Sequence, residues 1–290
     1  WLNTAKKSNN TVKAEIINML AGKGDAAAYA PALELLRSND ATARAAVANA
    51  AAITGKSEAA PVLIALMNKA GKEEAVAVKN ALLLLDSKTV AAPAAAALPT
   101  ASSSGKAALL DVLGEKAASN EVATVLPYLN SAEMDVKASA SGALNKMVGP
   151  ANLATLFPLL SSATNATDLK NAQGIVTSAV NGIADPAQRS TVLQNQFSAT
   201  PATQKAAFYP VLSGVGGKAE LQTMVKEFGY KNKKKKKAAI DAFAGWKNGE
   251  AASELARLVA ENKTSATAPL LNEAIKKQIA AVKKTKKKKY

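Results

Sequence analysis

The chain has 290 residues, of which 48% are apolar and 4% aromatic, and it contains neither cysteine nor histidine. Those absences exclude disulfides, thiolate nucleophiles, Cys/His zinc sites and histidine as a general base. The formal charge of +15 would favour a polyanionic partner, but subtracting the 12 lysines of two short tracts leaves +3, so the basic character is local. The tracts consist of Lys231 with Lys233 to Lys237, and of Lys283 and Lys284 with Lys286 to Lys289.

The first ten residues, WLNTAKKSNN, lack both an initiator methionine and the apolar core of a signal peptide. We interpret them as a processed or trimmed start and expect the chain to be a fragment of a longer protein. No run of about 18 apolar residues occurs, which excludes a membrane-spanning helix. The missing cysteines leave the compartment open, and a composition rich in Ala, Ser, Thr and Asn slightly favours an exported or periplasmic protein over a cytoplasmic one.

Helical segments of one kind recur along the chain. Each has about three turns with apolar residues at i, i+3, i+4 and i+7, followed by a polar stop. The spacing therefore predicts a series of first helices, and these lie at 29–40, 59–71, 90–100, 122–133 and 153–165.

Prolines mark several of these first helices. Pro31, Pro61 and Pro93 lie near a predicted helix start, where the missing N–H of proline would have had no partner. Pro127 and Pro158 fall later in their segments and are predicted to bend the helices that contain them.

Segments of a second kind alternate with the first, as at 39–55, 133–149 and 166–182. They share an acidic turn, small residues at helical spacing and a closing glycine. A basic residue stands near the start of each, at successive spacings of 27 to 35 residues with a mean of 32, which predicts a repeat architecture. We call these residues the basic ladder: Lys13, Arg44, Lys79, Lys106, Lys137, Lys170, Lys205 and Lys237.

The stretch EMDVKASASGALNKMVG at 133–149 resembles the second helix of a HEAT repeat, in the short bacterial form also seen in phycobilisome-lyase-like proteins. The resemblance covers about residues 11–282 and fades at 183–230. It implies an all-α fold, an α-α superhelix (HEAT-like solenoid) of about eight helical pairs, whose main use is as a binding surface. We therefore predict a single solenoid over residues 1–290 with a basic tail at 283–290.

The basic ladder has two interpretations. It could line one surface and grip an extended anion. Alternatively it is structural, because in HEAT-like families this residue bonds acidic groups at the turn between helices and ties neighbouring repeats. Asp40, which precedes Arg44 by four residues, fits the structural interpretation, as do Asp135 before Lys137 and Asp168 before Lys170. We favour the structural one.

Trp246 is either a core residue at the end of a second helix or an exposed platform for a ligand. Ile240 and Phe243 precede it at helical spacing and favour the core. The lysine tracts could bind nucleic acid or an anionic membrane, but no aromatic residues that would stack bases are interleaved with them. By register, Lys236 is predicted to face the core, where an unpaired lysine is costly.

Three functions remain open. The first is a non-catalytic module that binds a protein or peptide on its concave face, which the second helices line. The second is a nucleic-acid binder resembling the HEAT-like DNA glycosylases, although the catalytic aspartate of that family has no equivalent here. The third is the accessory solenoid of a larger exported bacterial enzyme. No phosphate-binding loop, nucleophile elbow or metal-ligand spacing appears, so we predict neither catalysis nor a cofactor or metal.

Overall fold

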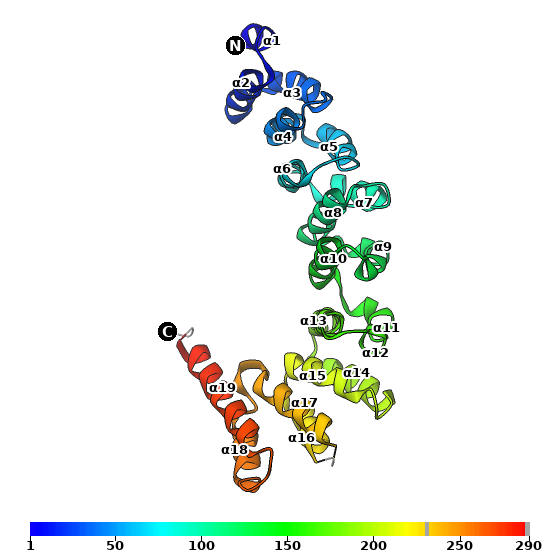
Figure 1. Ribbon diagram of the computed structural model, residues 1–290, viewed down its shortest axis with the longest axis vertical. Helices are drawn as coiled ribbons and strands as arrows, with labels where there is room; N and C mark the ends of the chain where they lie inside the picture. Colours follow the sequence, from blue (N-terminus) through cyan, green and yellow to red (C-terminus); the bar gives the residue numbers. More distant parts are fainter. Residues whose placement is uncertain (230–231, 288–290) are drawn as a thin grey trace. The chain divides into compact units, whose positions relative to one another are not determined.

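The computed structural model describes residues 1–229 and 232–287, and within these ranges it contains helices and no strands. The chain divides into two compact units, Trp1–Val148 (unit 1) and Gly149–Tyr290 (unit 2). Each unit is an all-α solenoid of stacked helical pairs, as the sequence predicts (Figure 1). The continuity of the solenoid across residues 1–290 stays a prediction.

Unit 1 begins with two helices and continues with four helical pairs. The first helices α3, α5, α7 and α9 stack on one side of the unit, and the second helices α4, α6, α8 and α10 stack on the other (Figure 1). The bounds are α1 Leu2–Lys6, α2 Asn10–Gly22, α3 Tyr29–Leu36, α4 Ala41–Gly55, α5 Ala60–Leu66, α6 Lys72–Leu83, α7 Ser87–Ala97, α8 Ser103–Glu115, α9 Val122–Val125 and α10 Met134–Met147.

Small residues let the helices of unit 1 approach closely. A Cβ on Gly105 would lie 2.1 Å from the carbonyl oxygen of Met67, and one on Gly114 would lie 2.7 Å from the Cα of Ala143. Both positions therefore require glycine, the first where α8 begins against the end of α5 and the second where α8 packs on α10. This is how a core with few aromatic residues reaches native packing density.

Unit 2 continues the alternation with four more pairs in its described residues. Its second helices α13, α15, α17 and α19 stack on one another, and α14, α16 and α18 precede three of them. The bounds are α11 Leu153–Leu156, α12 Leu159–Ser162, α13 Ala166–Asn181, α14 Pro186–Ala199, α15 Tyr209–Val215, α16 Lys218–Phe228, α17 Lys233–Ala244, α18 Ala252–Glu261 and α19 Ala268–Lys287. The two units together give the predicted eight pairs.

The late prolines, which were predicted to bend their helices, interrupt them. α9 ends at Val125, before Pro127, and the chain continues as a 3₁₀ helix over Leu126–Asn130. Pro158 likewise separates α11 from α12. The prediction for Pro93 is wrong, because α7 begins at Ser87 and therefore contains this proline in its interior, where it removes one helical hydrogen bond.

The predicted basic tail at 283–290 is helical as far as Lys287, where α19 ends, and residues 288–290 lie outside the described residues. None of the helices in the described ranges combines the length and the apolar character that crossing a membrane requires.

Candidate binding groove

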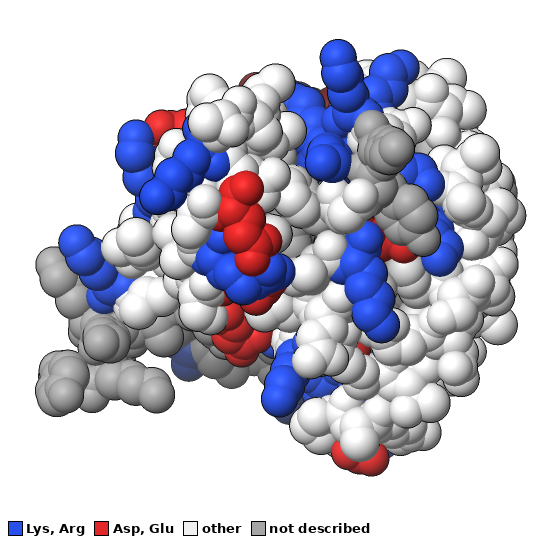
Figure 2. Space-filling model, turned by 90° about the horizontal axis from the view of Figure 1, so that it is seen from below, with Lys and Arg blue, Asp and Glu red and all other residues white. Residues whose placement is uncertain are grey.

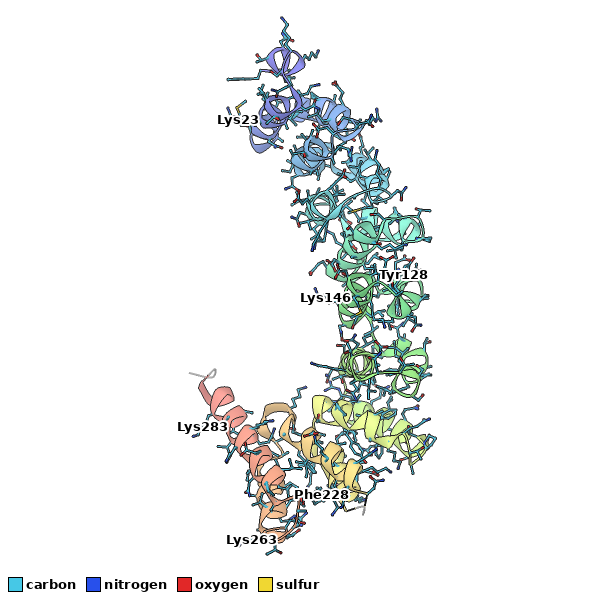
Figure 3. The ribbon with its side chains drawn as sticks, viewed as in Figure 1. Lys23, Tyr128, Lys146, Phe228, Lys263 and Lys283 are labelled. Atoms are coloured by element: carbon cyan, nitrogen blue, oxygen red, sulfur yellow. The ribbon has the colours of Figure 1, made fainter. Side chains whose placement is uncertain are left out.

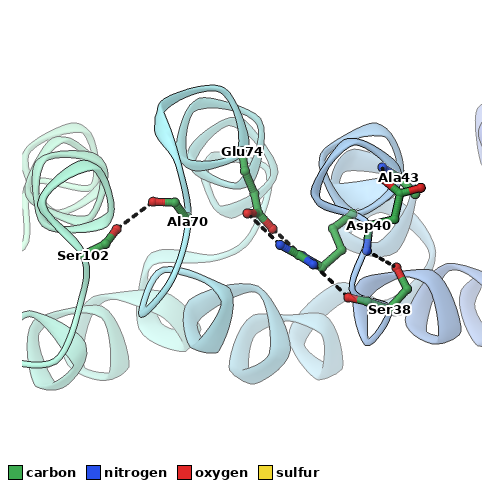
Figure 4. A network of polar contacts seen from close by, with 7 residues as sticks. Ser38, Asp40, Ala43, Ala70, Glu74 and Ser102 are labelled. Atoms are coloured by element: carbon green, nitrogen blue, oxygen red, sulfur yellow. Dashed lines mark hydrogen bonds and ion pairs between the residues drawn. The ribbon is translucent and has the colours of Figure 1, made fainter.

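The strongest polar contact in unit 1 joins two repeats. The Arg44 guanidinium donates from Nε to Glu74 Oε1 at 2.5 Å and from Nη2 to Glu74 Oε2 at 3.0 Å, and it also donates to the Ser38 carbonyl oxygen at 2.8 Å (Figure 4). The two side chains are only 5% and 4% exposed. The hydrogen bonds to Glu74 raise the pKa of Arg44 even though burial opposes its charge. The bidentate pair thus fixes α4 against α6.

The acidic partner of Arg44 differs from the one that we expected. Asp40 caps α4 instead, where its carboxylate accepts from the Ala43 N–H at 3.0 Å and from Asn10 Nδ2 at 3.1 Å. The hydrogen bond from the Ala43 N–H, followed by that from Asn10, lowers the pKa of Asp40. Arg44 contacts the preceding turn through the Ser38 carbonyl oxygen, but its carboxylate partner lies in the next repeat.

Other ladder residues make similar contacts. Lys13 bonds Glu34 at 2.8 Å and Lys79 bonds Asp111 at 3.0 Å, in both cases across a repeat boundary. Lys205 lies 3.8 Å from a buried carboxylate oxygen of Glu227.

The remaining four ladder residues differ from one another. Lys237 pairs at 2.8 Å with Asp241 of its own helix, and Lys137 is half-buried and engaged by a partner. Lys106 is half-buried and Lys170 is exposed, and neither has an ion-pair partner among the described residues. The contacts support a structural ladder, which stays a prediction, and they do not extend to every member.

Side chains that the sequence analysis did not single out also tie repeats together. Ser102 Oγ donates to the Ala70 carbonyl oxygen at 2.7 Å (Figure 4). Lys116 Nζ donates to the carbonyl oxygens of Leu83 at 2.8 Å and Leu85 at 2.5 Å. The partners lie 31 to 33 residues apart in the chain, which is one repeat length, and this constant separation is the signal that could have found them.

Trp246 is a core residue. Its side chain is 2% exposed and its ring centroid lies 6.1 Å from that of Phe243, so it offers no face to a ligand. The alternative of an exposed platform is therefore wrong for this structure. Gln278 of α19 donates to the Trp246 carbonyl oxygen at 3.1 Å and so ties α19 to this part of the core.

The lysine tracts lie only partly within the residues whose side chains the structure describes. Lys231 lies outside the described residues, and Lys233 to Lys237 form the first turns of α17. Lys236 is half-buried rather than in the core, with Nζ 5.1 Å from the centre of the Phe228 ring. On the face drawn in Figure 2, basic side chains occur in separate groups with acidic ones among them. In the second tract Lys283 is exposed.

A groove runs along α8 on the second-helix face of unit 1. Its walls carry two large apolar side chains, Val76 of α6 at 46% exposure and Met134 of α10 at 70%. Its floor is made of small residues of α8, namely Ser103, Ser104, Ala107 and Ala108, and the hollow has a volume of about 630 Å³. We call this hollow and its continuation the α8 groove.

The continuation lies toward the ends of the same helices, with a volume of about 560 Å³, and it shares Lys79 and Asp111 with the first hollow. Lys146 lines it and forms an ion pair with Glu115 at 2.5 Å. Figure 3 shows Lys146 on the opposite side of the α9–α10 pair from Tyr128, so the groove is confined to the second-helix side.

The groove has a signal in the sequence that was missed. Val76, Ser103 and Met134 each stand three residues before a ladder residue of successive second helices. The middle repeat thus has a small side chain where its neighbours have large ones, and this difference hollows the surface over α8. The repeats aligned by their basic residues show it directly.

One comparison with known protein families agrees with this architecture. Residues 1–82 match the family model of HEAT repeats. This part of the chain is therefore similar to HEAT repeats. The crystal structure of an engineered protein is similar at 16% identity and a TM-score of 0.41, over 95% of this chain and 86% of that chain, a likeness too low to bear on function. A comparison with curated proteins gives no match.

Proposed function

We propose that this HEAT-repeat chain is a non-catalytic binding module that engages a protein or peptide along the α8 groove. The observation that carries the proposal is the exposure of Val76 and Met134 on facing walls above a floor of small side chains. A soluble surface leaves few large apolar side chains so exposed without a use, and methionine adapts its shape to varied partners. HEAT repeats generally mediate protein interactions, which agrees with this role.

The chemistry of the groove supports binding rather than turnover. Lys79 and Asp111 are paired with each other, as are Lys146 and Glu115, so these charges hold the walls together. Within the described ranges, no group of three or more acidic side chains is arranged to hold a metal ion. A nucleic-acid role finds less support, because the ring beside Lys236 belongs to the buried Phe228 and cannot stack on a base.

The test uses a display library of random linear peptides. The library is selected on the wild-type chain, and the enriched peptides are measured against Ala107→Glu, which places a long charged side chain on the groove floor. We expect their affinity to fall at least tenfold. The matched control is Ala96→Glu, the same change at an exposed position of α7, and it should leave affinity unchanged. Peptides that bind Ala107→Glu as well as the wild type would refute the site.

A further inference from the structure

The rim of the α8 groove carries unequal charges. Glu133 and Asp135, at the start of α10, both line it and are exposed, and neither carboxylate has an ion-pair partner among the described residues. On the facing wall, Lys72 is also exposed and unpaired among those residues. Since Lys79 and Asp111 neutralise each other, the unpaired charges around the first hollow are two negative and one positive. Lys116, which lines the continuation, is held by the carbonyl oxygens of Leu83 and Leu85. The Met134 wall therefore favours a cationic group.

The floor of the groove restricts the backbone of an occupant. Ala107 and Ala108 present methyl groups, and Ser103 and Ser104 add two hydroxyls. The described part of the chain has no strand, so an extended peptide would find no edge with which to pair its N–H and C=O groups. An α-helix satisfies its own backbone and needs only side-chain contacts. The floor therefore suits a helix better than an extended segment.

The dimensions of the groove agree with a helix. α8 has 13 residues and so spans about 20 Å at 1.5 Å per residue. α6 and α10 flank it, and packed helices lie about 8 to 10 Å apart, which places the two wall helices roughly 16 to 20 Å from each other. A helix with its side chains is about 10 Å wide, so the free width between the walls is about 6 to 10 Å. The helix therefore lies over α8, and only its side chains enter the space between α6 and α10.

Resting on the proposed function, we propose that the α8 groove takes an amphipathic helix of a partner protein. The helix lies along α8 and places aliphatic side chains between Val76 and Met134. A lysine or arginine on its flank pairs with Glu133 and Asp135. Acidic residues at this flank are disfavoured, so the α10 wall determines which way the charged side of the partner faces.

The experiment uses a synthetic peptide chosen from the groove-dependent sequences of the library selection. Its basic residues are replaced by glutamate in a second peptide, and a proline is placed at its centre in a third. All three are measured against the wild-type chain, against Glu133→Lys/Asp135→Lys, and against the control Glu15→Lys/Glu58→Lys. The control makes the same change in net charge at exposed positions outside the groove.

We expect the basic peptide to bind the wild type and the control about fivefold more tightly than the acidic peptide, the effect of two exposed ion pairs. The preference should reverse on Glu133→Lys/Asp135→Lys and shrink in about 0.5 M salt. The proline peptide should lose binding at least tenfold because it cannot form a continuous helix. Circular dichroism of each variant confirms that it is folded.

Other results would overturn the inference in distinguishable ways. Groove-dependent peptides without a charge preference, or peptides that tolerate the proline, would leave the proposed function standing and remove the basic helix. Peptides that bind Ala107→Glu as tightly as the wild type would refute both the proposed function and the basic helix. Sedimentation that shows a wild-type dimer and a monomeric Ala107→Glu variant would assign the groove to a second copy of this chain and refute a separate partner.

Discussion

In unit 1 the repeats are packed with alanine, leucine and valine and joined by ion pairs such as Arg44–Glu74, whereas in unit 2 aromatic side chains enter the interior. All five phenylalanines of the chain lie in unit 2. Phe197 and Phe208 contact each other edge to face at 6.3 Å, and Phe228 and Phe243 do so at 6.5 Å. The helical pairs of the two units thus share one architecture, but small side chains stabilise them in unit 1 and aromatic side chains do so in unit 2.

The two units also differ in the groups that contact their buried carboxylates. In unit 1, Glu74 meets a guanidinium. In unit 2, Glu220 accepts from the Ser190 hydroxyl at 2.6 Å, and Glu227 accepts from the Tyr209 hydroxyl at 2.7 Å, with Lys205 farther away at 3.8 Å. The helical pair therefore fixes where the helices stack and leaves the chemistry of the repeat boundary free to vary.

The largest effect is expected from Phe243→Ala in unit 2. This side chain is fully buried against Phe228 and Trp246, and its loss leaves a cavity that these rigid rings cannot fill. Urea unfolding should show a loss of about 4 kcal/mol. Because each repeat contacts only its neighbours, hydrogen exchange should accelerate in α15, α17 and α19 and stay unchanged in α4 and α6. Uniform acceleration through both units would contradict the local packing described above.

The next effect is expected from Arg44→Met in unit 1. The substitution leaves the Glu74 carboxylate buried without its partner, which should lower the free energy of unfolding by about 3 kcal/mol. Arg44→Met/Glu74→Leu should recover most of the loss, because an apolar pair replaces a buried ion pair at little cost.

The matched control is Arg257→Met in α18, whose pairs with Glu254 and Glu261 are exposed, and which should leave stability nearly unchanged. Equal losses in the single and double variants of Arg44 would show that the ion pair is not the source of the effect.

The fold could be predicted from the sequence because its cause repeats in the sequence. Arg44 and its equivalents recur at a constant spacing, with small residues at helical intervals after them. This pattern specifies a helical repeat that must stack on its neighbours. Pro127 and Pro158 indicated where two helices depart from a straight course, although these helices are interrupted rather than bent. Pro93 was misplaced because Ser87 to Thr89, which begin α7 after the Asp86 cap, carry no apolar pattern.

The candidate site was harder to predict. The partner of Arg44 is 30 residues away, and the register between two helices depends on packing that local spacing does not contain. The groove arises because Ser103 is small where the equivalent residues of the neighbouring repeats are large. A search for motifs of reactive groups does not detect such a difference in size. Trp246 shows the converse, since Ile240 and Phe243 at helical spacing favoured the core over a ligand platform, and the side chain is buried.

The smallest effect is expected from Asp40→Asn, and it separates helix capping from charge at a repeat boundary of unit 1. In the folded chain the N–H of Ala43 and the amide of Asn10 lower the pKa of Asp40 below its usual 3.8. A carboxyl whose folded pKa is depressed contributes stability that is present above the unfolded value and is lost as the pH falls through the folded value. Asparagine caps a helix as well as aspartate but does not titrate.

The urea midpoints of the wild type and Asp40→Asn, measured from about pH 7 to about pH 2.5, should therefore differ slightly at neutral pH and converge as the pH falls below 3.8 through the depressed folded pKa. Asn10→Ala removes the donor from the preceding repeat and should narrow the neutral-pH gap between the wild type and Asp40→Asn. If the gap stays constant down to the lowest pH, the carboxylate of Asp40 does not stabilise the boundary through its charge, and only its geometry as a cap matters.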